Sequence, residues 1–375
     1  MERRCYRFFA IMPRTVTLPD EMSDPRQKNA ECVIVLGNHL SHAGIGDIVY
    51  TVYAHFSRHL RVRVQEFLEP GAFNIIIDEF TNPRFAEYLK DTKKAHPGTK
   101  YAIVATEFYT PLRIPVFGIE GTFNFFGARA DWVSLGGHVL RDLKLAQRPH
   151  SYMHRRFLGF LAAIEVADLI LSVHPEILAS LELLSQRTQK VLCPAANIYP
   201  TIDLDSRNRM RHLRTLPFGF ALTGSLTPYR AKAGARLRQA FDLAGYRAAV
   251  YKEIPFRPAE KLSLEAYPIE TPEYLFNFNP PQQPRWAFSS PMRLLRAALL
   301  GQIPVVTRMF GDHAIESIAL LWKPSIETAQ RFWCDSTLGR ETLIEGFVRS
   351  VADYNKIAEE ENKALAKACI EAGIR

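Results

Sequence analysis

The stretch SSPMRLLRAALLGQIPVV at residues 289–306 decides the fold of the second half of the chain. Ser290 can cap a helix, because a serine hydroxyl accepts a hydrogen bond from the unpaired N–H groups of the first turn. Pro291 suits the first helical position, and Gly301 suits the residue that follows the last turn. The apolar residues 303–307 then have the pattern of a buried strand. The stretch therefore predicts a helix that leads directly into a strand of a parallel sheet.

The same alternation of strand and helix extends on both sides of this stretch. Upstream, the pattern predicts three strands and one helix, at residues 218–223, 247–251, 274–279 and 231–244. Downstream, residues 340–372 have amphipathic spacing and predict one or two closing helices. Because alternating strands and helices are typical of a doubly wound parallel sheet, we predict a Rossmann-like lobe at residues 215–340 and closing helices at 341–375.

The first half of the chain repeats this organisation. Apolar runs predict six strands, at residues 32–36, 62–64, 74–78, 101–106, 169–173 and 190–193. Helical spacing predicts three helices, at residues 48–60, 157–167 and 175–184. We predict a first Rossmann-like lobe at residues 30–205, preceded by a flexible leader at 1–29 and containing an irregular Gly- and Phe-rich loop at 118–137. Pro200 and a polar, basic stretch indicate a linker at residues 195–216.

Composition indicates a globular protein, and its net charge favours an anionic ligand. Hydrophobic residues make up 47% of the 375 residues and charged residues 23%, which is typical of a folded protein. The net charge of +8 favours nucleotide phosphates, lipid head groups or nucleic acid. Nucleic acid is supported by charge alone, since no recognition motif accompanies it. The five cysteines form no CxxC pair, which indicates a reducing compartment without a zinc site or disulfide framework.

The sequence shows no signal peptide and no transmembrane span. The longest apolar run, residues 157–173, is interrupted by Glu165 and Asp168, so it is unsuited to a bilayer core. Basic residues gather at 141–156 and 207–214. These runs are either solvated helix faces with a basic linker or a surface that faces a membrane or another polyanion. We therefore predict a cytoplasmic protein, with peripheral contact to a membrane as an open alternative.

The loop after the strand at 218–223 is the first candidate ligand site. In doubly wound sheets, ligands bind at the carboxyl ends of strands, where the next helix points free N–H groups toward them. Gly224 would let the backbone approach a phosphate, Ser225 and Thr227 supply hydroxyl groups, and Arg230 and Lys232 supply positive charge. An ordinary helix cap with solvent-facing cations is the alternative interpretation.

The second candidate site is the start of the helix at 291–300. Ser290 and Arg293 stand at its N-terminus, and the loop at 308–312 brings Gly311 to the end of the next strand. A helix N-terminus with an arginine is suited to an anionic group. The two loops together predict one anion site on the second lobe.

These residues resemble a known family. The pattern S-P-x-R-L-x-x-A-x-x-x-G-x-I-P-V-V, followed by the Gly311-Asp312 turn, is similar to the donor-binding half of glycosyltransferases of the GT-B type, which have two Rossmann-like lobes with a cleft between them. The likeness covers residues 218–322. It implies that Ser290 and Arg293 face the diphosphate or ribose of a nucleotide sugar, and that the Gly224 loop with Arg230 and Lys232 faces the diphosphate. It also implies that the closing helices pack back toward the first lobe.

One position departs from this pattern. The family's helix typically carries a glutamate that holds the ribose, whereas this chain has Arg296 before Ala297. Glu316 is a substitute carboxylate in one interpretation and an ordinary solvent-exposed helix residue in the other. The departure leaves the identity of the donor open.

The loop at residues 39–47 of the first lobe supplies candidates for the acceptor side. It contains the glycines Gly44 and Gly46, which would line the cleft, and it precedes a predicted helix. Asp47 and His42, or His39, could act as the general base that deprotonates an acceptor hydroxyl. Asp47 could equally be a plain helix cap. At the end of another strand, Glu107 could line the acceptor side.

Several further patterns carry less weight. Asp203 and Asp205 spell a DxD motif but fall in the predicted linker, and the histidines show no metal-ligand spacing. A few residues of the irregular loop could contact a sugar or lipid or simply pack in the core: Glu120, Phe123, Phe125, Phe126 and Trp132. We therefore predict no metal site and no obligatory cofactor.

The expected fold class is α/β, with two Rossmann-like doubly wound lobes of the GT-B type. The expected function is transfer of a sugar from a nucleotide-diphosphate sugar, as co-substrate, to a glycan, a lipid-linked compound or another hydroxyl acceptor. Two alternatives remain at this point: a nucleotide-sugar epimerase of similar fold, and a degenerate module that binds a glycan or nucleotide without catalysis. The expected partners are the donor and the acceptor, with peripheral membrane contact as an open alternative, and a specific nucleic acid is not expected.

Overall fold

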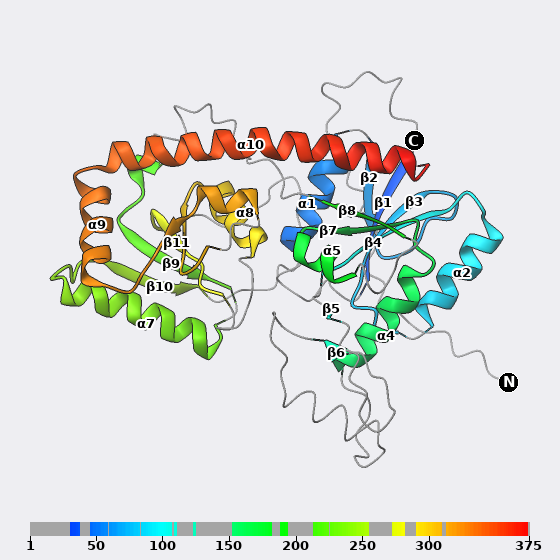
Figure 1. The fold of residues 1–375 in the computed structure, drawn as a ribbon, viewed down its shortest axis with the longest axis horizontal. Helices are drawn as coiled ribbons and strands as arrows, with labels where there is room; N and C mark the ends of the chain where they lie inside the picture. Colours follow the sequence, from blue (N-terminus) through cyan, green and yellow to red (C-terminus); the bar gives the residue numbers. More distant parts are fainter. Residues whose placement is uncertain are drawn as a thin grey trace, which may run out of the picture.

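The computed structural model shows two α/β lobes side by side, joined along one face by a long helix (Figure 1). The structure describes thirteen segments: residues 31–37, 46–58, 60–82, 84–106, 109–110, 123–124, 152–181, 188–193, 213–224, 226–254, 272–281, 290–309 and 313–373.

The first lobe is built on a six-stranded parallel sheet with the order β2-β1-β3-β4-β7-β8. Its strands are β1 (Glu31–Leu36), β2 (Arg61–Gln65), β3 (Phe73–Ile77), β4 (Lys100–Val104), β7 (Leu169–Ser172) and β8 (Gln189–Leu192). The helices are α1 (Gly46–Phe56), α2 (Phe85–Ala95), α4 (Tyr152–Ile164) and α5 (Pro175–Leu181). Strands such as β3 and β7 are buried along their whole length, because helices cover both faces of a parallel sheet.

The second lobe has a five-stranded sheet with the order β10-β9-β11-β12-β13, and every pairing in it is parallel. Its strands are β9 (Gly219–Thr223), β10 (Val250–Ile254), β11 (Phe276–Phe278), β12 (Ile303–Val306) and β13 (Leu320–Leu321). Its helical elements are α7 (Pro228–Leu243), α8 (Pro291–Leu299), the 3-10 helix η2 (Ala314–Ile318) and α9 (Ile326–Thr337). The two sheets confirm the predicted fold class, two Rossmann-like lobes.

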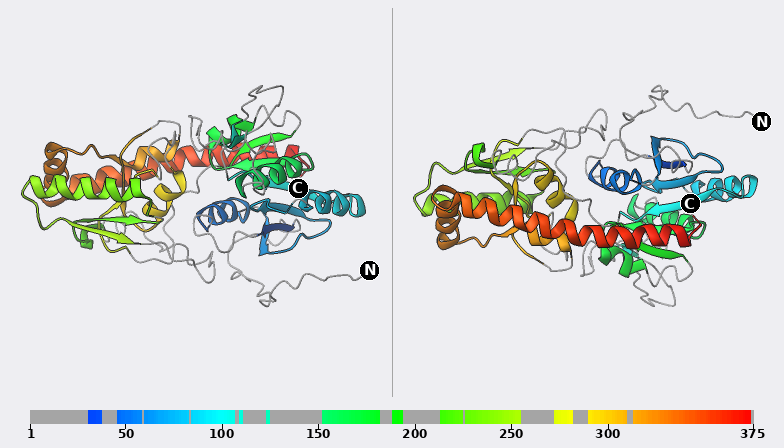
Figure 2. Two further views of the ribbon diagram at one scale, coloured as in Figure 1. Left: turned by 90° about the horizontal axis from the view of Figure 1, so that it is seen from below. Right: turned by 90° about the horizontal axis from the view of Figure 1, so that it is seen from above.

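One continuous helix, α10 (Arg340–Glu371), closes the chain and runs along both lobes (Figure 2). It packs against η2 and α9 in the second lobe and against β8 in the first. Its buried positions recur at intervals of three, four or seven residues over much of its length, for example Ile344, Phe347, Val351, Tyr354 and Ala358. The apolar face of α10 therefore ties the lobes together.

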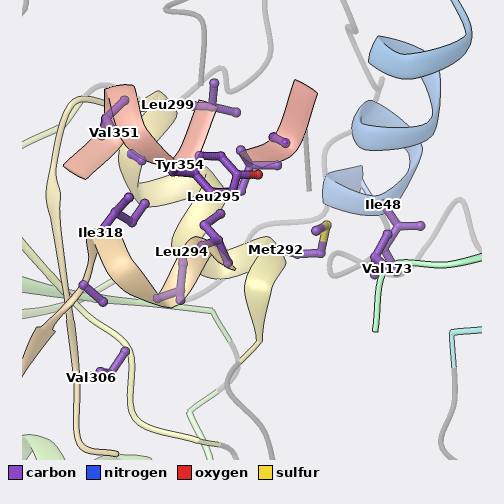
Figure 3. Packing of buried hydrophobic residues seen from close by; sticks show 14 of the residues in the cluster. Ile48, Val173, Met292, Leu294, Leu295, Leu299, Val306, Ile318, Val351 and Tyr354 are labelled. Atoms are coloured by element: carbon purple, nitrogen blue, oxygen red, sulfur yellow. The ribbon is translucent and has the colours of Figure 1, made fainter. Parts of the chain in front are cut away.

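The largest hydrophobic cluster is continuous between the lobes. It extends from one face of the first sheet through α1 and α8 into the second lobe, where many of its members are aromatic. Figure 3 shows Ile48 and Val173 of the first lobe opposite Met292 on α8. In the same view, Leu295 on α8 lies beside Tyr354 of α10. The start of α8 therefore sits at the boundary between the lobes.

Several predicted boundaries differ from the structure. The strand expected at 247–251 lies three residues later, because α7 ends at Leu243 and a turn with Gly245 at φ +87° precedes the strand. The helix expected at 231–244 begins at Pro228, because the Thr227 hydroxyl caps it by accepting a hydrogen bond from the backbone N–H of Arg230. Within the stretch predicted to be irregular, β6 (Phe123–Asn124) pairs with β5 (Tyr109–Thr110). Sequence analysis predicted none of α9, η2 or β13.

Candidate functional site

The strand order places a switch of direction at the carboxyl ends of β9 and β11. From β9 the chain moves to β10 on one side and then crosses to β11 on the other, so the segments after β9 and β11 diverge. Ligands in doubly wound sheets bind at this switch of direction. Gly224 directly follows β9, and Ser290 precedes the helix that follows β11. Both sequence-predicted loops thus lie where the topology favours a ligand.

Arg230 organises the loop after β9. Its side chain is fully buried, and its Nη2 donates a hydrogen bond of 2.7 Å to the backbone carbonyl oxygen of Thr223. Gly224 adopts φ +99°, a conformation that L side chains rarely adopt, and an added Cβ there would lie 3.3 Å from Arg230 Nη1. Burial lowers the pKa of Arg230. The loop therefore depends on a glycine beside a buried cation.

Arg293 lies in the first turn of α8, close enough to other charged groups for them to shift its pKa. Burial, together with the like charges of Arg230 and Arg296, lowers the pKa of Arg293 to about 9, whereas the charge of Asp47 opposes the shift. Among the residues that the structure describes, the Arg293 side chain forms no hydrogen bond and no ion pair. Keeping a buried cation in this state is costly, so an anionic ligand would stabilise it.

The first lobe reaches this site through the start of α1. The Asp47 carboxylate Oδ1 lies 3.5 Å from Nε of Arg296, and the two side chains are 5% and 13% exposed. One turn later on α1 and one turn earlier on α8, the Thr51 hydroxyl lies 3.3 Å from the sulfur of Met292. The helices α1 and α8 therefore contact each other directly across the boundary between the lobes. Three guanidinium groups and one carboxylate meet there.

The structure gives different placements to the other predicted site residues. Gly46 begins α1, and Ser290 is the residue before α8, although its side chain makes no capping hydrogen bond. Lys232 lies on the exposed side of α7. The remaining predicted positions lie outside the described residues: His39, His42, Gly44, Glu107, Glu120, Phe125, Phe126, Trp132, Asp203, Asp205, Ser225 and Gly311.

Glu316 corrects the interpretation of that position as a solvent-exposed helix residue. It lies on η2 and is only 4% exposed. The short helix η2 packs against both α8 and α10, and this packing buries Ile315, Glu316 and Ile318. The sequence did not indicate this burial, because a five-residue 3-10 helix has too few residues to show a periodic pattern.

Two contacts at the boundary between the lobes were not predicted. The first is the ion pair between Asp47 and Arg296. The second is an edge-to-face contact between His174, which follows β7, and His313, which precedes η2, with ring centroids 5.7 Å apart. Burial raises the pKa of Glu361 on α10, and the charge of His313 opposes that shift. In the sequence, only the ion pair left a trace: Arg296 stands near the position where the resembled family typically has a glutamate.

The described segments contain no group of three or more His, Cys, Asp or Glu side chains that could hold a metal ion. None of the helices placed by the structure combines the length and apolar character needed to cross a bilayer. Most of the two basic runs, residues 141–151 and 207–212, lies outside the described residues.

Comparisons with known proteins gave structural likenesses only. No family model matches the sequence, and no curated protein matches it. HepE of Anabaena, solved with UDP-glucose, shares 10% identity at a TM-score of 0.40, over 88% of this chain and 99% of that chain. A UDP-forming trehalose-phosphate synthase from Burkholderia xenovorans shares 10% identity at a TM-score of 0.43, over 88% and 79%.

A third solved structure is an alpha-glucosyltransferase in complex with UDP and a 13-mer DNA. It shares 8% identity at a TM-score of 0.47, over 89% of this chain and 99% of that chain. The assignment of two Rossmann-like lobes rests on the strand order of the chain itself. The chain is an α/β protein with two parallel sheets, each in its own Rossmann-like lobe.

Proposed function

We propose that this protein is a glycosyltransferase that binds a nucleotide-diphosphate sugar on its second lobe, with the diphosphate at Arg230 and Arg293. The observation that carries the proposal is the position of Arg293: a partly buried guanidinium in the first turn of α8, without a hydrogen bond or ion pair among the described residues. Buried cations are normally paired. A diphosphate bound there would supply the missing negative charge.

The surroundings of Arg293 support a diphosphate as the ligand. The N-termini of α7 and α8 follow β9 and β11 at the switch of direction in the sheet, and helix N-termini favour anions. Arg230 adds a second guanidinium and Gly224 allows close approach of the backbone. We place Ser225, Thr227, Ser290 and Gly311 around this ligand as well. Lys232 is an outer contact, and Glu316 is the candidate for the ribose.

The chemistry follows from this placement. In sugar transfer the bond between the anomeric carbon and the diphosphate oxygen breaks, and its electron pair stays on that oxygen. The acceptor hydroxyl oxygen forms the new bond to the same carbon and loses its proton. Guanidinium groups and helix N-termini fixed beside the departing diphosphate stabilise the charge that develops on it. The first lobe, with Gly44, Gly46 and Glu107, would hold the glycan or lipid-linked acceptor, and His42 is the candidate base.

Binding of nucleotides tests the proposal first. We expect one of UDP, GDP, ADP and CMP, or one of their sugar conjugates, to raise the melting temperature of the wild-type protein. A ligand present at 100 times its Kd stabilises the folded state by about 2.7 kcal/mol. Lys232→Ala should reduce the effect only slightly, since Lys232 is exposed. Arg331→Ala, which changes an arginine that is 82% exposed on α9, serves as the control.

The product then separates the alternatives. Release of nucleoside diphosphate that depends on an added acceptor would support a transferase. Release of rearranged sugar without an acceptor would favour the epimerase, and binding without any turnover would favour a non-catalytic module. Failure of every nucleotide to change the melting temperature would refute the donor site while leaving the fold unaffected.

A further inference from the structure

Asp47 brings a negative charge to the arginines of the site. It belongs to the first lobe, yet its carboxylate pairs with Arg296 of the second lobe in a setting where both side chains are almost fully buried. A buried ion pair gains little net stability, because removing both charges from water costs about as much as their attraction returns. A purely structural contact at this boundary would therefore be served as well by apolar side chains. The pair is better explained by what its charges do to the site.

The charges of these four groups can be counted. Arg230, Arg293 and Arg296 contribute three positive charges and Asp47 contributes one negative charge, which leaves +2. The charge of Asp47 raises the pKa of Arg293, whereas the charges of Arg230 and Arg296 lower it. Its carboxylate therefore lowers the positive potential at the place where a ligand would bind.

We propose that Asp47 is a specificity-determining residue, the internal counter-ion that matches this site to a dianion rather than to a more highly charged ligand. The inference rests on the proposed function. A nucleotide-diphosphate sugar carries one negative charge on each of its two phosphate groups. After transfer, the terminal phosphate of the nucleoside diphosphate ionises a second time with a pKa of about 6. At neutral pH the product therefore carries one negative charge more than the donor.

The consequence is that Asp47 favours release of the product over release of the donor. With Asp47 present, the four protein groups carry +2, and two negative charges of the diphosphate already balance them. The third negative charge of the product then gains little from these groups. Without it, the site would have a charge of +3 and would hold the product most tightly. This role differs from that of a general base, because the carboxylate acts through its charge at Arg296 and does not take up a proton.

Calorimetric titration of Asp47→Asn at low ionic strength tests the inference. The probes are the donor and nucleoside diphosphate that bind the wild-type protein, together with inorganic pyrophosphate. Two charges a few ångströms apart near a protein surface interact by a few kcal/mol before screening. We expect the variant to bind the nucleoside diphosphate about tenfold more tightly, which corresponds to about 1.4 kcal/mol. The donor should gain less, so the product-to-donor affinity ratio should rise about threefold or more.

Asp168→Asn is the matched control. It makes the same chemical change in an ion pair of the first lobe, where Lys93 Nζ lies 2.9 Å from the Asp168 carboxylate. Asp168 pairs with residues of α2 and β4 rather than with the arginine cluster. We expect its product-to-donor affinity ratio to equal that of the wild type, even where its melting temperature falls.

A double variant keeps the inference testable if Asp47→Asn does not fold. Asp47→Asn combined with Arg296→Met removes one charge of each sign, so the count for these four groups returns to +2. Its product-to-donor ratio should match the wild type. The inference would be overturned if the ratio in Asp47→Asn stayed at the wild-type value, if both ligands weakened together, or if the double variant kept the raised ratio.

The two proposals fail in different ways. Wild-type binding of a nucleotide sugar with an unchanged ratio in Asp47→Asn would remove the inference and leave the transferase proposal intact. Tighter binding of inorganic pyrophosphate by Asp47→Asn, but not by Asp168→Asn, in a protein that binds no nucleotide would support the charge count. That same result would remove the transferase proposal.

Discussion

Replacing Arg293 with methionine is expected to weaken binding of the nucleoside diphosphate about 100-fold or more, while the ligand-free protein becomes more stable. A charge-assisted hydrogen bond contributes about 1.5–3 kcal/mol, and Arg293 is placed to make more than one of them with a diphosphate. The gain in stability has a separate cause. Folding places the guanidinium in a partly buried position near the like charges of Arg230 and Arg296, and an apolar side chain of similar volume avoids that cost.

The sign of this effect follows from the pKa of Arg293, which burial and the nearby like charges lower from its ordinary value to about 9. Below pH 9 the group is charged in both the folded and the unfolded chain, so the full cost of burying its charge is present. Above pH 9 the folded form can lose the proton and the cost declines. We therefore expect a gain of about 1–3 kcal/mol for Arg293→Met at neutral pH, which becomes smaller as the pH rises past 9.

Thermal unfolding of the ligand-free protein at several pH values and calorimetric titration with the nucleoside diphosphate measure the two effects. Arg331→Met is the control, because Arg331 is 82% exposed and forms only a surface ion pair with Asp335. It should change neither affinity nor melting temperature appreciably. Lower stability of Arg293→Met, or unchanged affinity, would show that Arg293 is a structural residue rather than a ligand-binding one.

Replacing Trp322 with alanine should have the largest effect on stability. Trp322 is 1% exposed and stacks on Phe241 with ring centroids 5.7 Å apart, and its ring also meets the edge of Phe332. Truncation of a buried tryptophan costs about 3–5 kcal/mol, because the cavity it leaves is filled only in part. The loss falls on the second lobe, which carries the proposed donor site.

Chemical denaturation, followed by tryptophan fluorescence and by circular dichroism, measures this loss in the free energy of unfolding. Trp333→Phe is a suitable control, since Trp333 is only partly buried and a phenylalanine keeps an aromatic ring beside Tyr246. We expect Trp322→Ala to unfold at a clearly lower denaturant concentration, and its remaining folded fraction to bind nucleotide normally. A loss below 1 kcal/mol would mean that the aromatic cluster is not the stabilising core of the second lobe.

Patterns that are local in the sequence predicted most of the fold. The apolar runs of β1, β3, β7 and β12 identified buried strands, and Ser290 with Pro291 fixed the start of α8. The elements that were missed have physical reasons. The helix α9 has a mixed polar sequence in which Ala329, Phe332 and Ser336 alone are described as buried, and η2 and β13 are too short to show periodicity.

The candidate site was predicted in part. Arg230 and Arg293 stand next to local signals, a glycine after a strand and a helix N-terminus, so the sequence placed them correctly at the ends of strands. The partner of Arg296 could not be found in this way. Asp47 lies in the other lobe, and its contact depends on how α1 and α8 pack together. Such contacts are set by the arrangement of whole lobes rather than by any motif.

A crystal structure of the wild-type protein with the nucleoside diphosphate that stabilises it would test the central claim most directly. The account predicts that the diphosphate lies at the N-terminus of α8, within hydrogen-bond distance of the guanidinium groups of Arg293 and Arg230. A nucleotide bound elsewhere, or one whose diphosphate contacts neither arginine, would contradict it.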